Sequence, residues 1–447
     1  MRAAIPPDGK RAMKLQLSRR LWVISQVMRQ LWFVAAIYCV AGIATALIGI
    51  LLDPFIPEGL GETIGADSVG SLLSIIASSM LTVLIFSLNT VVQASSAAAS
   101  SATPRAVGTL LEDRTAQAAL STFLGSFIFS LVGLIALNTS LYGTGGRLVL
   151  FIATLAVIVL IIGILLRWIN YLGRLGKVSR TIEQVEDQAV TAMRNYRAEP
   201  FLGGREFDGR MPGGLQLIDP PETGYLRFVD MAALDAVSRK LDADIYVLER
   251  PGAFVAPGRH IAGIRLPQDS KVAGEEVIAE AAGAFTIGHE RSYTQDPLYG
   301  VTVMSQIALR ALSPAVNDPG TAIDVVTHLV RILEAGETPD ADREPRYPRI
   351  HMPAIAAEEF FDAAFTAIAR DGAGMAEVVI HLLHACRALG HTDIPNFSEM
   401  SDRFMTLSVA RAKETLRFQS DIERIERAAG RVNAASPVTF RKNNPEQ

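Results

Sequence analysis

The chain contains 447 residues, of which 49% are hydrophobic, and it carries a formal net charge of −4. Its mean hydropathy of +0.27 excludes an ordinary soluble protein of this length, and the apolar excess is concentrated before residue 171. The acidic balance and the absence of a long basic run in the second half exclude a nucleic-acid-binding protein. Two cysteines, Cys39 and Cys386, are too few for a disulfide framework and fit a reducing compartment.

The first 30 residues are basic and amphipathic, which predicts a helix lying on cytoplasmic headgroups. Four transmembrane helices are expected next, within residues 31–170, at about 31–52, 69–93, 117–138 and 148–169. The loop at 53–67 has acidic residues but no Lys or Arg, whereas basic residues precede the first span and follow the fourth. The positive-inside rule therefore predicts a multi-pass protein with both termini in the cytoplasm.

The second span combines an apolar helix with a line of hydroxyl and amide side chains. No charged residue lies between Asp67 and Arg105. At about 100° per residue, one helix face is polar and is interrupted only by Ile85 and Phe86. From residue 68 to Pro104 such a helix is about 54 Å long and exceeds a hydrocarbon core of about 30 Å. The polar positions on this face are Ser71, Ser74, Ser78, Thr82, Asn89, Gln93, Ser96 and Ser100.

Two interpretations of the polar face remain open. In a ring of several copies, the hydroxyls and amides would line a water-filled path, with Ile85 and Phe86 as an apolar gate that closes by dewetting. Alternatively, the same side chains pack and hydrogen-bond between helices, as small polar residues often do in membranes.

The soluble part begins with a connecting helix at 177–196 and a Gly- and Pro-rich loop, together 171–214. Residues 215–295 are expected to form a small α+β unit with strands at 224–229, 245–248, 254–256 and 261–264 and a helix capped by Asp230. The glycine spacing over 251–261 resembles the half-barrel turns of biotinyl and lipoyl carrier folds. Because no lysine lies at the hairpin tip, we expect a structural β-barrel-like unit rather than a carrier.

Residues 296–430 are expected to form a cytoplasmic helical bundle, with helices at 297–312, 321–333, 356–370, 374–389 and 399–429. Residues 336–353 are interpreted as a loop, and 431–447 as a disordered tail. The fold class is therefore membrane α-helical with a cytoplasmic α+β domain.

A cytoplasmic polar cluster is a second candidate site. It could bind a small anionic ligand or ion at the positive end of the helix that begins at Pro319. Alternatively, its arginines satisfy only loop carbonyls and carboxylates at a subunit contact. The cluster comprises Arg291, Asp296, Arg310, Asn317, Asp318 and Thr321.

Metal and enzyme motifs are weak. His381, His384, His391 and Cys386 do not complete a recognised metal-ligand spacing. Nucleophile-elbow, phosphate-loop and dinucleotide motifs are absent from the sequence. We therefore expect a protein that is not an enzyme and has no cofactor.

Three segments carry a family resemblance: residues 103–105, residues 285–291 (FTIGHER) and residues 307–322 (IALRALSPAVNDPGTA). Together they resemble a family of predicted bacterial membrane proteins described as a domain of unknown function. The resemblance implies an inner-membrane protein with an N-terminal four-span region and a C-terminal cytoplasmic domain.

The leading functional hypothesis is a homo-oligomeric inner-membrane channel or pore lined by the second span, with a cytoplasmic assembly and gating domain. Its expected partners are membrane lipid and further copies of itself. The alternative is a membrane-anchored ligand sensor or scaffold that does not conduct.

Overall fold

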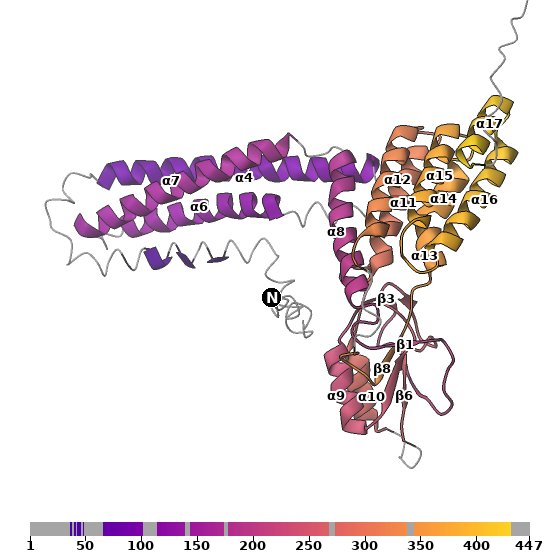
Figure 1. Ribbon diagram of the computed structural model, residues 1–447. Helices are drawn as coiled ribbons and strands as arrows, with labels where there is room; N and C mark the ends of the chain where they lie inside the picture. Colours follow the sequence, from indigo (N-terminus) through magenta and orange to yellow (C-terminus); the bar gives the residue numbers. More distant parts are fainter. Residues whose placement is uncertain are drawn as a thin grey trace, which may run out of the picture. The chain divides into compact units, whose positions relative to one another are not determined.

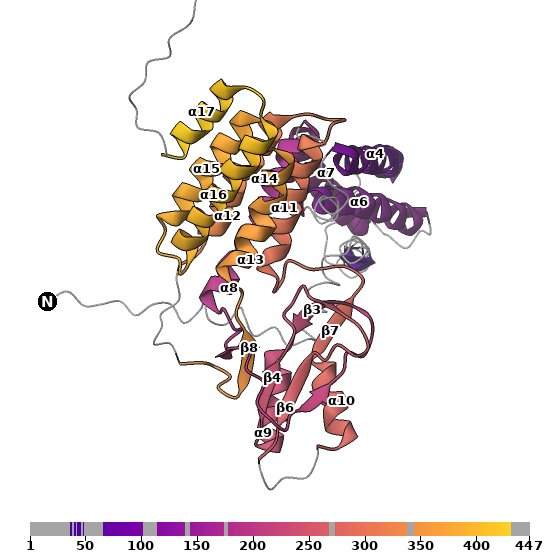
Figure 2. The same ribbon diagram turned by 90° about the vertical axis from the view of Figure 1, so that its right-hand side faces the viewer.

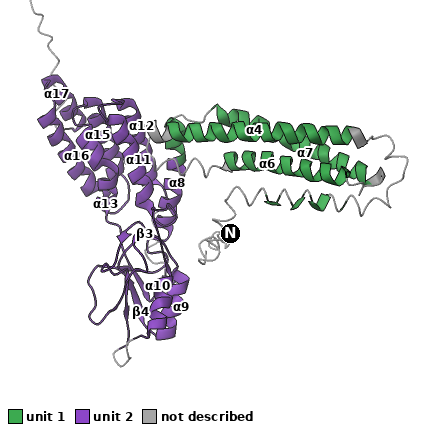
Figure 3. Cartoon of the chain, turned by 180° about the vertical axis from the view of Figure 1, so that it is seen from behind, with its two compact units in different colours: residues 1–184 green, residues 185–447 purple. Residues whose placement is uncertain are grey.

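The computed structural model describes residues 66–101, 114–138, 144–173, 178–267, 273–337 and 344–430, together with isolated positions between 36 and 48. Figure 3 shows two compact units, Met1–Gln184 and Val185–Gln447. The expected basic segment, nearly all of the first span and the expected tail lie outside the described residues.

The described part of the first unit is built from three long helices: α4 (Ala66–Ser101), α6 (Arg114–Asn138) and α7 (Thr144–Leu172). Each is long and apolar enough to cross a membrane, over Ser68–Ala97, Thr115–Asn138 and Gly146–Leu172. These helices confirm the expected second, third and fourth spans as helical segments. With 36 residues, α4 is about 54 Å long.

Helices α4, α6 and α7 pack against one another (Figure 1), and large apolar side chains fill the space between them. Leu73 and Leu150 are buried with Phe129 in one cluster, while Phe123 and Trp168 belong to another. The Trp168 ring contacts that of Phe123 edge-on at 6.4 Å between centroids. Trp168, near the end of α7, thus contributes to helix packing.

Helix α7 is nearly pure aliphatic and leaves much of its surface uncovered. Val159 is 67% exposed and Leu166 is 60% exposed. Lipid tails are as apolar as these aliphatic side chains, so this surface is suited to face the bilayer.

Helix α8 (Val178–Ala198) follows, close to the expected 177–196. Apolar positions at helical spacing, including Ile182, Val185, Ala189 and Met193, are almost fully buried.

The second unit contains two separate sheets (Figure 2). The five-stranded sheet has the order β1-β8-β4-β6-β2, and β8 (Ile350–Pro353) runs parallel to both of its neighbours. The three-stranded sheet has the antiparallel order β5-β3-β7. The remaining strands are β1 (Arg205–Phe207), β2 (Gln216–Ile218), β3 (Gly224–Val229), β4 (Asp244–Val247), β5 (Phe254–Val255), β6 (Ala262–Arg265) and β7 (Phe285–Gly288).

The expected barrel-like unit is therefore replaced by two sheets. Strands β4 and β6 pair in the larger sheet, but β5, which lies between them in sequence, pairs with β3 in the smaller one. This arrangement depends on a strand that is distant in the sequence, so local patterns could not predict the pairing. Strand β8, from a segment that we expected to be a loop, pairs with β4 along the edge that a barrel would need for closure.

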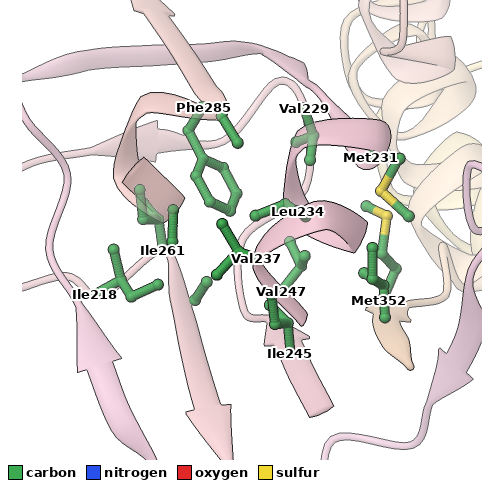
Figure 4. Packing of buried hydrophobic residues seen from close by; sticks show 14 of the residues in the cluster. Ile218, Val229, Met231, Leu234, Val237, Ile245, Val247, Ile261, Phe285 and Met352 are labelled. Atoms are coloured by element: carbon green, nitrogen blue, oxygen red, sulfur yellow. The ribbon is translucent and has the colours of Figure 1, made fainter. Parts of the chain in front are cut away.

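Two helices cover the apolar core of this α+β part: α9 (Met231–Leu241) and α10 (Glu275–Gly283). Figure 4 shows Leu234 and Val237 of α9 packed on Ile245 and Val247 of β4. Asp230 caps α9 as expected, because its Oδ1 accepts a hydrogen bond of 3.1 Å from the Ala233 amide.

The rest of the second unit is helical. Helices α11 and α12 match the expected pair, and the segment expected at 356–370 contains a π-helical turn, Asp362–Thr366. The single helix expected over 399–429 is broken, because Leu416 and Phe418 adopt extended conformations. The helices are α11 (Pro297–Leu312), α12 (Pro319–Glu334), α13 (Ala357–Phe361), α14 (Ala367–Asp371), α15 (Ala376–Gly390), α16 (Phe397–Thr415) and α17 (Gln419–Ala428).

Candidate functional site

The polar face of α4 is the leading candidate site, and the structure leaves it uncovered. Of the eight polar positions identified in the sequence, the seven with described side chains are exposed. The opposite face contains Val69, Leu73, Met80 and Val91, which are at most 6% exposed. The packing of α4 therefore uses its apolar side. The exposed polar residues are Ser71, Ser74, Ser78, Thr82, Asn89, Gln93 and Ser96.

The expected apolar gate lies on the same uncovered side. Ile85 is 54% exposed and Phe86 is 64% exposed. They occupy the turn between Thr82 and Asn89, so the polar line is interrupted near its middle.

The hydroxyl groups on this face are partly satisfied by their own helix. Ser78 Oγ donates to the Ser74 carbonyl at 2.9 Å, and Thr82 Oγ1 donates to the Ser78 carbonyl at 2.9 Å. Such hydroxyls can face lipid at little cost because their hydrogen-bonding capacity is used internally.

Asn89 and Gln93 differ from these hydroxyl residues. Their side chains make no hydrogen bond with any residue that the structure describes. A primary amide has two N–H donors and a carbonyl acceptor, so it needs an external partner in a membrane. The two amides lie four residues apart, one helical turn, on the exposed face.

The packing alternative has its own residues, which lie off the polar face of α4. Ser87 of α4 and Ser121, Ser126 and Ser130 of α6 are at most 1% exposed. Small side chains at these positions let the helices approach closely. Their small size can be read from the sequence, but their burial required the tertiary structure.

The cytoplasmic polar cluster does not form one site. Arg291 and Asp296 lie before α11, whereas Arg310, Asn317, Asp318 and Thr321 lie at or beyond its last turn. Because α11 has 16 residues, the two groups are about 20 Å apart.

The second group is used largely as a helix cap. Asp318 Oδ1 accepts from the Thr321 amide at 3.0 Å, and Oδ2 accepts from Thr321 Oγ1 at 2.6 Å. These hydrogen bonds lower the pKa of the Asp318 carboxyl. The positive end of α12, where anion binding was one of the two roles left open for this cluster, is thus already occupied by Asp318. Arg310 and Asn317 are exposed, and Asn317 has a φ of 50°.

The histidines are dispersed. His381 Nε2 lies 2.9 Å from Thr327 Oγ1, and burial lowers the pKa of the His381 imidazole. His384 and His391 are exposed, while Cys386 is buried with its pKa raised to about 12 by desolvation. Within the described ranges, no group of three or more His, Cys, Asp or Glu residues could hold a metal ion.

Comparison with known proteins identifies a family. The model of the family "Predicted membrane protein (DUF2254)" matches residues 28–388, well over half of the chain. The chain belongs to this family. The match includes the three candidate spans, both sheets and the helices through most of α15.

Individual relatives agree with this assignment. The chain is 25% identical over 344 residues to uncharacterized proteins of Mycobacterium bovis and Mycobacterium tuberculosis. The alignment covers 74% of this chain and 65% of the length of these relatives. No solved structure matches the chain. The chain is therefore a member of a membrane protein family, and its activity must be argued from its own residues.

Proposed function

We propose that the chain forms a homo-oligomeric pore in the bacterial inner membrane, lined by the polar face of α4. In this proposal the protein is multi-pass with cytoplasmic termini, and the second unit assembles and gates the subunits. One chain presents a single polar-faced helix and cannot enclose a path, so the pore requires a ring of subunits.

The observation that carries the proposal is the exposure of Asn89 and Gln93. Moving an unbonded amide from water into a hydrocarbon costs roughly 4–8 kcal/mol. Two such groups on a lipid-facing surface would be strongly unfavourable, whereas water in a pore would satisfy every donor and acceptor. The apolar α7 is available to meet lipid instead, since Val159 and Leu166 are exposed.

Conduction is the first test. Purified full-length protein in planar bilayers should give discrete currents, and Phe86→Ser should raise their amplitude or open probability because it wets the constriction. The matched control is Leu88→Ser. Leu88 is 48% exposed and lies about 200° around the helix from Phe86, so this change should leave the currents unaltered.

The position of the polar face is the second test. A Cys39→Ser chain with Asn89→Cys should form disulfide-linked oligomers in membranes, because identical faces meet around an axis. Leu88→Cys, at an exposed position about 100° around the helix from Asn89, is the control and should cross-link less. Absence of currents together with a monomer in detergent would overturn the pore and leave the non-conducting sensor or scaffold.

A further inference from the structure

The second unit contains a pocket that lies apart from the polar clusters discussed above. It has a volume of about 330 Å³ and lies where the end of α8, the segment between β8 and α13, and the turn before α16 converge. This volume is within the range of about 300–1,000 Å³ in which small-molecule sites fall.

The wall of this pocket is aromatic and well packed. The Tyr196 ring lies 5.8 Å from that of Phe360, which in turn lies 6.4 Å from that of Phe397. Phe360 and Phe397 are at most 5% exposed, and Met193 is 1% exposed. A row of fixed rings beside an opening offers a flat apolar surface to a ligand.

The only charged side chain among the described residues that line the pocket is Arg197. Its guanidinium donates to the carbonyls of Leu333 and Gly336. A guanidinium has five N–H donors, so these two contacts leave others available. No described carboxylate lies within ion-pair distance of Arg197.

The surroundings of Arg197 compensate its charge only in part, because Glu334 acts on it electrostatically without forming an ion pair. Burial lowers the pKa of its guanidinium, as expected for a cation that is partly removed from water. The nearby Arg250 pairs with Glu359, with Nη1–Oε1 at 3.0 Å and Nη2–Oε2 at 2.5 Å, so that pair adds no net charge. The pocket therefore combines an aromatic wall with one arginine that has no ion-pair partner among the described residues.

We propose that this pocket binds a small monoanion that has a ring-bearing apolar body, of the arylcarboxylate type. The carboxylate pairs with the free donors of Arg197, for which a planar fork is the preferred geometry. The apolar body packs on Tyr196, Phe360 and Phe397. The site lies wholly within residues 193–397 of the second unit, and the proposal does not depend on whether the chain conducts.

The test uses full-length protein in phosphatidylcholine nanodiscs, with empty nanodiscs as the blank. The probes are 2-naphthoate and its uncharged isostere 2-naphthamide, and binding is measured by equilibrium dialysis. We expect saturable naphthoate binding, with naphthamide about ten- to a hundredfold weaker because the amide lacks the negative charge and the second acceptor oxygen of the carboxylate.

Variants assign the binding to this pocket. Arg197→Met should weaken naphthoate binding to the level of naphthamide. Ile355→Trp, which fills the pocket and leaves Arg197 in place, should remove the binding of both probes. Arg265→Met in β6 is the control for a lost arginine elsewhere in the unit and should bind like the wild type. Thermal unfolding of each variant shows whether it is folded.

Three results would overturn the proposal. They are equal binding of the two probes, unchanged naphthoate binding in folded Arg197→Met or Ile355→Trp, and no saturable naphthoate binding at millimolar concentration. Because Arg197→Met removes contacts with Leu333 and Gly336, Ile355→Trp keeps the test decisive if Arg197→Met does not fold.

Discussion

Arg291 holds the buried carboxylate of Asp296 at two points, with Nε–Oδ2 at 2.7 Å and Nη2–Oδ1 at 2.9 Å. The same carboxylate caps α11, because Oδ1 accepts from the Tyr299 amide at 3.1 Å. Gly252, at the turn before β5, lies directly against it: a Cβ there would be 2.2 Å from Asp296 Oδ2. This ion pair therefore connects the α+β part with the helical part of the second unit.

Loss of the Asp296 carboxylate should destabilise the second unit. Asp296→Ala leaves the partly buried Arg291 without its carboxylate partner and removes a helix cap, which together cost roughly 3–5 kcal/mol. The measurement is hydrogen exchange of α11 amides in the full-length protein. Asp318 caps the neighbouring helix α12 at an exposed position. Asp318→Ala removes this cap and should cost only about 1 kcal/mol. Equal protection in the two variants would contradict a special role for the buried pair.

The contact between α8 and α11 depends on the absence of a side chain at Gly300. A Cβ at this position would lie 2.3 Å from Ala189 Cβ and 2.9 Å from Ala189 Cα. We expect Gly300→Ala to destabilise the unit by about 1–3 kcal/mol through overpacking. Adding Ala189→Gly should recover part of that loss, since it removes the nearer of the two atoms. Thermal unfolding of the single and double variants measures the coupling, and strictly additive losses would contradict the contact.

The larger sheet should become less stable in mild acid because of His351. This residue pairs across strands with Tyr246, and the rings stack at 4.5 Å between centroids. Burial lowers the pKa of His351 below its ordinary value of 6.5. The unfolded chain therefore takes up a proton below pH 6.5 that the folded chain does not, and stability falls as the pH drops through this range.

Hydrogen exchange of β4 and β8 amides between pH 7 and pH 5, corrected for intrinsic rates, measures this effect. His351→Phe keeps a ring for stacking on Tyr246 but cannot titrate. It should show a smaller loss of protection on acidification. An identical pH dependence in the wild type and the variant would show that His351 does not contribute.

Cys386 should be unreactive in the folded protein. Its side chain is 1% exposed, and burial raises the pKa of its thiol to about 12. Because the thiolate is the reactive form, a Cys39→Ser chain should resist maleimide labelling at neutral pH until it is denatured. An exposed position such as Ser398→Cys provides the positive control, and rapid native labelling of Cys386 would contradict the burial.

The accuracy of the sequence predictions followed the range of the interactions involved. Helix α8, the cap at Asp230 and the start of α12 at Pro319 depend on residues within a turn or two, and each was predicted nearly to the residue. The break at 416–418 was missed because its apolar positions continue a helical spacing. The polar face of α4 was identified correctly as a face, but its exposure depends on where α6 and α7 pack.

The sequence by itself determined the apolar helices, the polar line along α4 and most local elements of the second unit, because periodicity and capping act between near neighbours in the chain. Only the tertiary structure decided that β8 pairs with β4, that α11 separates Arg291 from Arg310, and that Arg197 meets Phe360 and Phe397 at one pocket. These relationships join distant segments, and they follow from the simultaneous burial of many side chains, which no local pattern encodes.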